Sequence, residues 1–342
     1  MNISNFLKTN QISLSRFINL CLYAKNKGFY QNNKIGSHFV TSPEISQVFG
    51  ECIAIFFLLL LKNFRIKRFC ELGPGNGTLM MDLILTIKKF VNTPLKFYLY
   101  EKSKFLRSLQ SSNLRSFSSD KIKIEFLNNL NIKKKPIFFL CNEFFDALPI
   151  NQFEKVNNFW FEKRVIYSNE LKIINVKTQH DFNKNYKNGD IVEISPLSNL
   201  YIKKVLKHIK SFGGGFLIFD YGPFHKGNID TLQAIYNSKK CGILDFPFQS
   251  DITYHVDFNA IKKIVKDVGL ICYGPIMQKD FLFFHGINER FFKLIKNEKS
   301  KKKIKILEKQ FEKLTSPDGM GGLIKCLFIS KSKINSNLFN HK

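Results

Sequence analysis

The chain has 342 residues, and 53 Lys and Arg against 27 Asp and Glu give it a formal net charge of +26. Hydrophobic residues make up 44 %, which is enough for a sizeable core and excludes wholesale disorder. The longest apolar run, 53–61, is too short to cross a bilayer, and no secretory signal is visible at the N-terminus. We therefore expect no stable membrane insertion.

The seven cysteines are scattered, and none forms a C-x-x-C pair. This usage predicts no metal cluster and no disulfide framework, and it indicates a reducing compartment, for which we expect a cytoplasmic location. The positive charge leaves nucleic acid open as a partner. However, the lysines are spread along the whole chain, and only 296–305 is a dense basic run, typical of the solvated face of a helix.

Strand-like and helix-like segments alternate from residue 65 onward. The patterns predict strands and helices in the order strand 65–72, helix 78–90, strand 95–101, helix 104–114, strand 121–127 and strand 136–143. Such alternation indicates a parallel sheet covered by helices on both faces. Before it, residues 1–64 read as an N-terminal helical cap.

After residue 150 the pattern becomes irregular. A stretch of alternating residues at 151–177 predicts an antiparallel insertion, and 228–258 is polar and rich in loops. The remaining segments predict helix 195–212, strand 216–222, helix 259–269, strand 270–276, a basic helix at about 288–314 and a tail strand 323–330. We thus expect an α/β domain over 65–342 with insertions at about 151–190, 223–258 and 286–320.

Three glycines, Gly73, Gly75 and Gly77, separate the first strand of this pattern from its helix. A glycine loop there permits a sharp turn and close approach of a ligand. Dinucleotide sites need G-x-G-x-x-G, but the sixth position here is Thr78. The carboxylate of Glu71 would repel a negatively charged pyrophosphate. It suits an ammonium group, such as the amino acid end of S-adenosyl-L-methionine.

The ends of the next two strands fit a nucleoside in the same place. Glu101 ends the second strand, where a carboxylate hydrogen-bonds ribose hydroxyls, and Asn128 ends the third, close to where an adenine would lie. We therefore expect S-adenosyl-L-methionine as the cofactor rather than NAD, with Glu71, the three glycines, Thr78, Glu101, Asn128 and Asn142 binding it.

Several blocks together resemble the MidA-like class I methyltransferases, a family that includes the mitochondrial complex I assembly arginine methyltransferase. They are 39–51, 71–84, 100–110, 142–153, 217–222, 230–235 and 250–258. The resemblance implies a Rossmann-like class I fold, with a mostly parallel seven-stranded sheet and helices on both faces. It also implies S-adenosyl-L-methionine as the methyl donor, an arginine of a protein substrate as the acceptor, and Ser42, Pro43 and Glu44 as a lid edge over the cofactor.

The segment after the fourth strand bears on which chemical group accepts the methyl. Nucleic-acid amino methyltransferases have Asn/Asp-Pro-Pro-Tyr/Phe there, whereas this chain has Asn142-Glu143-Phe144-Phe145, without the prolines and with a carboxylate. An acid beside the transferable methyl suits the fork of an arginine guanidinium. We therefore expect Asn142, Glu143 and Asp146 to be catalytic. The alternative is that Glu143 caps backbone amides and Asp146 caps a helix.

Polar residues alternate in the segment 250–258, with Asp251, Thr253, His255 and Asp257 on one face of a predicted strand. We expect His255 and Asp257 to close the acceptor pocket, although a half-buried strand with no substrate contact gives the same pattern. Asp220 and Tyr221 end the fifth strand of the sheet and are expected to line the same cleft.

Two further functions remain open at this point. A nucleic-acid methyltransferase is favoured by the charge and opposed by the missing prolines. A respiratory-complex assembly factor would keep the fold and act through binding surfaces alone.

Overall fold

The computed structural model describes residues 11–36, 40–61, 66–182, 185–334 and 337–339. Its residues form two compact units. Unit 1 comprises Met1–Asn33, Phe145–Tyr201 and Lys226–His255, and unit 2 comprises Lys34–Phe144, Ile202–His225 and Val256–Lys342. No helix in the described ranges is long and apolar enough to span a membrane.

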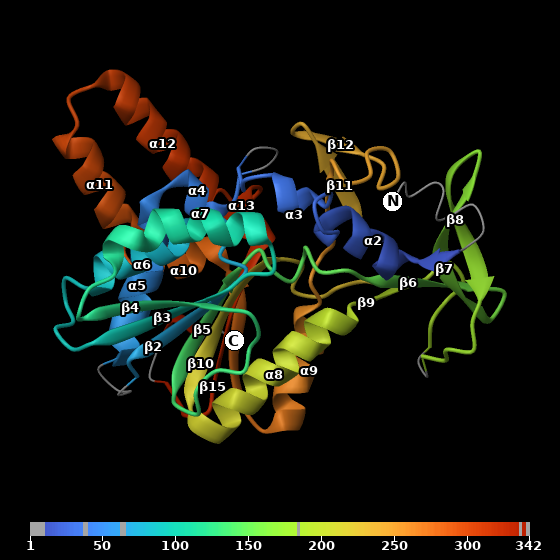
Figure 1. The fold of residues 1–342 in the computed structure, drawn as a ribbon, viewed down its shortest axis with the longest axis horizontal. Coiled ribbons are helices and arrows are strands. Elements are labelled where there is room, and N and C mark those ends of the chain that lie inside the picture. Colours follow the sequence, from blue (N-terminus) through green and yellow to red (C-terminus); the bar gives the residue numbers. More distant parts are fainter. Residues whose placement is uncertain (1–10, 37–39, 62–65, 183–184, 335–336, 340–342) are drawn as a thin grey trace. The chain divides into compact units, whose positions relative to one another are not determined.

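A seven-stranded sheet runs through unit 2 in the order β14-β15-β10-β5-β2-β3-β4 (Figure 1). Its strands are β2 (Arg68–Leu72), β3 (Leu95–Tyr100), β4 (Ile122–Leu127), β5 (Ile137–Asn142), β10 (Gly214–Tyr221), β14 (Ile271–Met277) and β15 (Ile324–Ser330). The five strands from β4 to β10 are parallel, and β15 is antiparallel to both of its neighbours, β10 and β14. The expected mostly parallel seven-stranded sheet is confirmed.

Helices cover both faces of this sheet. On β5, Phe138 packs against Phe57 of helix α5 with ring centroids 5.1 Å apart, whereas the next residue, Phe139, packs against His208 of helix α8 at 5.3 Å. Adjacent residues of a strand point to opposite faces, so α5 and α8 lie on opposite sides. The helices of unit 2 are α4 (Ser42–Ile45), α5 (Gln47–Leu61), α6 (Thr78–Ile87), α7 (Lys104–Leu114), α9 (Phe258–Val268), α10 (Gln278–Phe284), α11 (Ile287–Asn297), α12 (Lys301–Thr315), α13 (Met320–Leu323), the 3₁₀ turns η1 (Arg115–Phe117) and η2 (Asn337–Phe339), and most of α8 (Pro196–Phe212).

Helices α4 and α5 belong to unit 2, whereas the sequence predicted a separate cap up to residue 64. Helix α5 is apolar on nearly all sides: Phe49 contacts Phe219 of the sheet, and Phe56 contacts Phe281 of α10, with ring centroids 5.4 Å apart in both pairs. A helix buried between a sheet and further helices needs such a composition. The predicted boundary at residue 64 is therefore not seen in the division of the structure into units.

The predicted basic helix at 288–314 is in fact two helices, α11 and α12. Ser300 caps the second, because its hydroxyl accepts a hydrogen bond from the Lys303 N–H. Phe291 and Phe311 pack the two helices together, with ring centroids 5.4 Å apart.

Antiparallel sheets make up most of unit 1. One contains β1 (Ile12–Ser13), β7 (Phe159–Ser168), β6 (Asn151–Val156), β9 (Ile191–Ile194) and, paired with β7, β8 (Glu170–Lys177). The other contains β12 (Lys239–Cys241), β11 (Gln233–Tyr236) and β13 (Asp251–Thr253), and the helices are α2 (Leu14–Tyr23) and α3 (Phe29–Asn32). The antiparallel pairing expected over 151–177 is confirmed, and the segment 228–258, expected to be loop-rich, contains a second small sheet.

Candidate active site

The glycine loop joins β2 to α6 and has left-handed backbone at each of its glycines. The φ angles of Gly73, Gly75 and Gly77 are 64°, 54° and 84°. A Cβ on Gly73 would lie 2.5 Å from the Phe144 ring, and one on Gly75 would lie 2.8 Å from the side chain of Ile35. Both the backbone conformation and the lack of space therefore require glycine at these two positions.

Side chains around the loop fix its shape. The Asn76 side chain donates to the Ile35 carbonyl at 2.8 Å and accepts from the Ile35 N–H at 3.1 Å. Gln110 Nε2 donates to the Gly75 carbonyl at 2.7 Å. The Thr78 hydroxyl donates to Glu44 Oε1 at 2.6 Å. This contact gives Thr78 a role in holding the loop, and its role toward the cofactor stays a prediction.

Two buried or half-buried acids lie beside the loop. Burial, followed by the nearby charges of Asp82 and Glu101, raises the pKa of Glu71 to about 8. Burial also raises the pKa of Glu101 to about 7, although its carboxylate accepts from the Ser103 N–H at 2.8 Å. Carboxyl groups with such pKa values release their protons when a cation binds next to them.

The polar atoms without partners at this site are acceptors. Within the described residues, Glu71 Oε2, Gln110 Oε1 and Asn142 Oδ1 are buried and have no hydrogen-bond partner. Asn142 follows Cys141, which pairs with Leu72 just before the loop. Buried acceptors normally find a donor, so this set fits a ligand that brings donors and positive charge. The ammonium, sulfonium and ribose hydroxyls of S-adenosyl-L-methionine supply both.

Asn128 lies at the end of β4, as expected. Its side chain is exposed, and its Oδ1 accepts a hydrogen bond from Arg107. Its predicted contact with the adenine stays a prediction.

Glu143 has an unusual backbone conformation directly after β5. Its φ is 49°, a left-handed value that is uncommon for a residue with a side chain, and its N–H donates to the Phe219 carbonyl at 2.9 Å. Its Oε1 accepts two hydrogen bonds, from the Ser42 N–H at 3.1 Å and from Asn142 Nδ2 at 3.0 Å. Strained backbone of this kind clusters at functional sites.

Two of the expected acceptor-binding acids accept hydrogen bonds from backbone amides. The buried Asp220 carboxylate accepts from the N–H groups of Phe144 at 3.2 Å and Tyr221 at 2.9 Å, so it fixes the chain that follows Glu143. Asp257 caps helix α9 by accepting from the Ala260 N–H at 3.0 Å. These contacts give both acids a structural role, and their contact with an acceptor stays a prediction. Tyr221 is half-buried against the core.

The structure thus brings together in unit 2 the residues at the carboxyl ends of β2, β3, β5 and β10. They are Glu71, Gly73, Gly75, Gly77, Thr78, Glu101, Asn142, Glu143 and Asp220. The site also uses residues that the sequence did not predict as ligands or supports. Gln110 had no motif around it, and Ser42 and Glu44 were suggested through the family resemblance alone.

Asp146 and His255 belong to unit 1. Asp146 is buried in a turn closed by the Leu148 N–H and the Phe145 carbonyl at 3.1 Å, so no helix begins there for it to cap. Its carbonyl accepts from the Tyr254 N–H at 3.1 Å.

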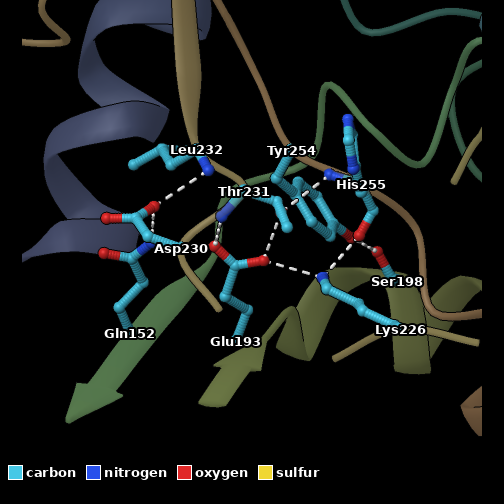
Figure 2. A network of polar contacts seen from close by, with 9 residues as sticks. All are labelled: Gln152, Glu193, Ser198, Lys226, Asp230, Thr231, Leu232, Tyr254 and His255. Carbon is cyan, nitrogen blue, oxygen red and sulfur yellow. Dashed lines mark hydrogen bonds and ion pairs between the residues drawn. The ribbon is translucent and has the colours of Figure 1, made fainter. Parts of the chain in front are cut away.

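The backbone of His255 is held by a buried network (Figure 2). Its N–H donates to the Thr231 hydroxyl at 3.0 Å, and its carbonyl accepts from the Lys226 ammonium. Lys226 forms an ion pair of 2.7 Å with Glu193, whose side chain is fully buried. Glu193 also accepts from the Thr231 N–H at 3.0 Å and from Gln152 at 2.8 Å. The block 230–235 was a signal for this network, but it did not reveal Glu193 or Lys226.

The predicted alternation holds from Ile252 to Phe258, where buried and half-exposed residues alternate, but the predicted strand is shorter and Asp251 departs from the pattern. Strand β13 ends at Thr253, and Asp251 points into the core of unit 1, where it accepts from the Tyr30 hydroxyl at 2.7 Å. Burial raises the pKa of Asp251 to about 6.

Comparison with known proteins decides the family. Residues 52–276 match the family described as "Putative S-adenosyl-L-methionine-dependent methyltransferase". The chain belongs to this family. It is 30 % identical to the mitochondrial protein arginine methyltransferase NDUFAF7 of Xenopus laevis over 362 residues, which cover 93 % of this chain and 80 % of the relative.

Other matches agree with this assignment to the methyltransferase family. The mitochondrial NDUFAF7 homolog of Caenorhabditis elegans, also named a protein arginine methyltransferase, is 28 % identical over 90 % of this chain and 81 % of its own. A Burkholderia thailandensis structure with bound S-adenosyl-homocysteine superposes with a TM-score of 0.85 at 22 % identity, over 98 % of this chain and 92 % of that one. At that identity the superposition shows the fold alone.

Proposed function

We propose that this methyltransferase acts on an arginine of a protein substrate. The observation that carries the proposal is the Glu143 carboxylate, which two donors orient directly after the central strand β5. The residue after it, Phe144, packs on Gly73 of the glycine loop. The relatives named above are protein arginine methyltransferases, and they match nearly the whole chain.

Different carboxylates would serve the cofactor and the acceptor in this reaction. When bound, S-adenosyl-L-methionine supplies an electrophilic methyl group on a sulfonium. Glu71 would pair with the ammonium of the bound cofactor and Glu101 would accept from its ribose hydroxyls. Glu143 would hold the guanidinium fork of the acceptor and take the proton that leaves the attacking nitrogen, because an arginine is always protonated in water.

The acceptor protein and the compartment are finer proposals. The family resemblance favours a subunit of respiratory complex I as the acceptor. The named relatives are mitochondrial, so the matches do not support the cytoplasmic location expected from the cysteine usage, and that location stays a prediction.

A nucleic-acid substrate is the second candidate, and the net charge of +26 favours it. Binding that rests on phosphate contacts weakens steeply as salt rises. If neither RNA nor DNA binds at low salt, this candidate is excluded.

Replacing Glu143 by Gln tests the arginine proposal. The assay follows tritium from labelled S-adenosyl-L-methionine into the proteins of a cell extract, with amino acid analysis for methylarginine. We expect Glu143→Gln to lower methylarginine formation about 100-fold, because the amide cannot take a proton. Calorimetry should show cofactor affinity within about twofold of the unmodified protein, since the uncharged amide side chain keeps a carbonyl oxygen for the Ser42 N–H.

Two controls accompany this measurement. Glu170→Gln removes an acid whose side chain is 73 % exposed and should not change the rate. Gly75→Arg should abolish cofactor binding. A Glu143→Gln variant with full activity would contradict the catalytic role of Glu143, and label found only in other residues or in nucleic acid would contradict arginine as the acceptor.

A further inference from the structure

The short helix α4 contacts both parts of the site described above. Glu44, in this helix, accepts hydrogen bonds from Asn76 at 3.0 Å and Thr78 at 2.6 Å in the cofactor loop. Ser42, at its first position, donates its backbone N–H to Glu143 Oε1 at 3.1 Å. The segment 40–46 therefore joins the loop that would bind the cofactor to the carboxylate that would bind the acceptor.

A second set of buried contacts fixes the position of Ser42. The Ser42 hydroxyl donates to Gln278 Oε1 at 3.0 Å, and Gln278 Nε2 donates to the Leu314 carbonyl at 3.1 Å. Ser42 and Gln278 are fully buried, with 0 % of their surface exposed. Because neither contact competes with water, the N–H that faces Glu143 is held from α10 and from the end of α12.

Glu143 needs this support because its own backbone does not favour the observed conformation. A left-handed residue other than glycine is strained and persists where its surroundings determine it. The donors Ser42 N–H and Asn142 Nδ2 reach the same oxygen of Glu143, Oε1. Donors to a carboxylate form stronger hydrogen bonds than neutral pairs do, so they set the rotation of the carboxylate plane.

We propose that Ser42 is a positioning residue for methyl transfer: its backbone N–H orients the Glu143 carboxylate toward the acceptor, and Gln278 keeps that N–H in place. The inference deepens the proposed function and rests on it through the role of Glu143. A misplacement of about 1 Å at a reacting group can cost about 100-fold in rate.

A pair of substitutions at position 42 isolates the N–H. Ser42→Pro removes the hydroxyl and replaces the N–H by a ring methylene that faces Glu143 Oε1, and Ser42→Ala removes the hydroxyl alone, so the difference between them reports the loss of the N–H contact together with the space that the methylene takes. Proline is favoured at the first position of a helix, and Thr41 before it is extended, with φ −89° and ψ 161°, as a residue before proline prefers.

We expect Ser42→Pro to form methylarginine about 10- to 100-fold more slowly than Ser42→Ala at saturating S-adenosyl-L-methionine, with the KM for the cofactor equal within about twofold. The full-length variants are compared on the same extract, with melting temperatures as the folding control. Equal rates for the two folded variants would overturn the proposal, and so would a loss that appears only in the KM.

Gln278→Leu provides a second route if Ser42→Pro does not fold. It leaves the N–H present but removes the contact that fixes it, so we expect a several-fold lower maximal rate with an unchanged KM for the cofactor. An unchanged maximal rate would overturn the role of Gln278 and, with it, the proposal that buried contacts to Ser42 position Glu143.

Crystallography of the variants tests this inference separately from the proposed function. Crystal structures of Ser42→Pro and Ser42→Ala with S-adenosylhomocysteine are expected to differ by about 1 Å in the position of Glu143 Oε1. An identical carboxylate position in both would overturn the positioning role. If the unmodified protein forms no methylarginine, the proposed function fails, and the two crystal structures still decide whether Ser42 positions Glu143.

Discussion

At the scale of single residues, the predicted site carboxylates differ in their hydrogen-bond partners. Asp220 and Asp257 accept from backbone amides, whereas Glu71 has a buried oxygen with no partner in the described residues. The sequence predicted all three as site residues. It could not separate them, because an acid at a strand end or before a helix is equally suited to capping and to binding a ligand.

Cofactor binding should release a proton from Glu71. With a pKa of about 8 in the cofactor-free protein, Glu71 is mostly protonated at pH 7, and a cation bound beside it lowers that pKa. Calorimetric titration with S-adenosyl-L-methionine at pH 7, in two buffers of different ionisation enthalpy, should show close to one proton more released by the unmodified protein than by Glu71→Gln. We also expect Glu71→Gln to bind the cofactor about tenfold or more weakly. The same buffer dependence in both proteins would contradict this role.

At the scale of elements, periodicity predicted the helices and strands of unit 2 closely. The predicted helix 104–114 is α7, and strands β2 to β5 lie within the predicted ranges. The strands β11 and β12 were missed because segments of three or four residues are too short to show an alternating pattern, whereas β13 is the first part of the strand predicted over 250–258. The place of β15 between β10 and β14 was also beyond the sequence, since it depends on pairing between distant parts of the chain.

The glycine loop permits a test that separates backbone strain from cofactor binding. Gly75→Ala places a Cβ 2.8 Å from Ile35 at φ 54°, whereas Gly269→Ala has φ 76° and no atom within 4 Å of the new Cβ. Gly269→Ala should lose about 1–2 kcal/mol of stability in urea unfolding, because L-residues disfavour left-handed backbone, and Gly75→Ala should lose at least as much because its Cβ also meets Ile35. We expect cofactor affinity to fall about tenfold or more in Gly75→Ala alone. An equal loss of cofactor affinity in both variants would mean that the stability of the fold, and not the shape of the glycine loop, governs cofactor binding.

At the scale of the whole molecule, unit 1 is assembled from three separate stretches of the chain. The network around Glu193 and Lys226 joins two of them, since Glu193 lies on β9 and Lys226, Thr231 and His255 come from the third stretch. Composition could not predict such a pair. Most of the lysines that the structure describes are exposed, and nothing in the sequence around Lys226 marks its side chain, only 8 % exposed, as covered by the fold.

Removing one member of this pair should destabilise the protein far more than removing an exposed pair. Lys226→Met leaves the fully buried Glu193 carboxylate without its cation, which costs about 3–5 kcal/mol when a buried pair is broken. Lys172→Met removes a lysine paired with Glu170, where the side chains are 53 % and 73 % exposed, and such pairs contribute at most about 1 kcal/mol. Urea unfolding of the two variants, followed by protease susceptibility within unit 1, measures the difference. If both variants lose the same small free energy of unfolding, the hydrogen bonds from Thr231 and Gln152 suffice to compensate the Glu193 charge. A selective loss in Lys226→Met would mean instead that the ion pair holds the second and third stretches of unit 1 together.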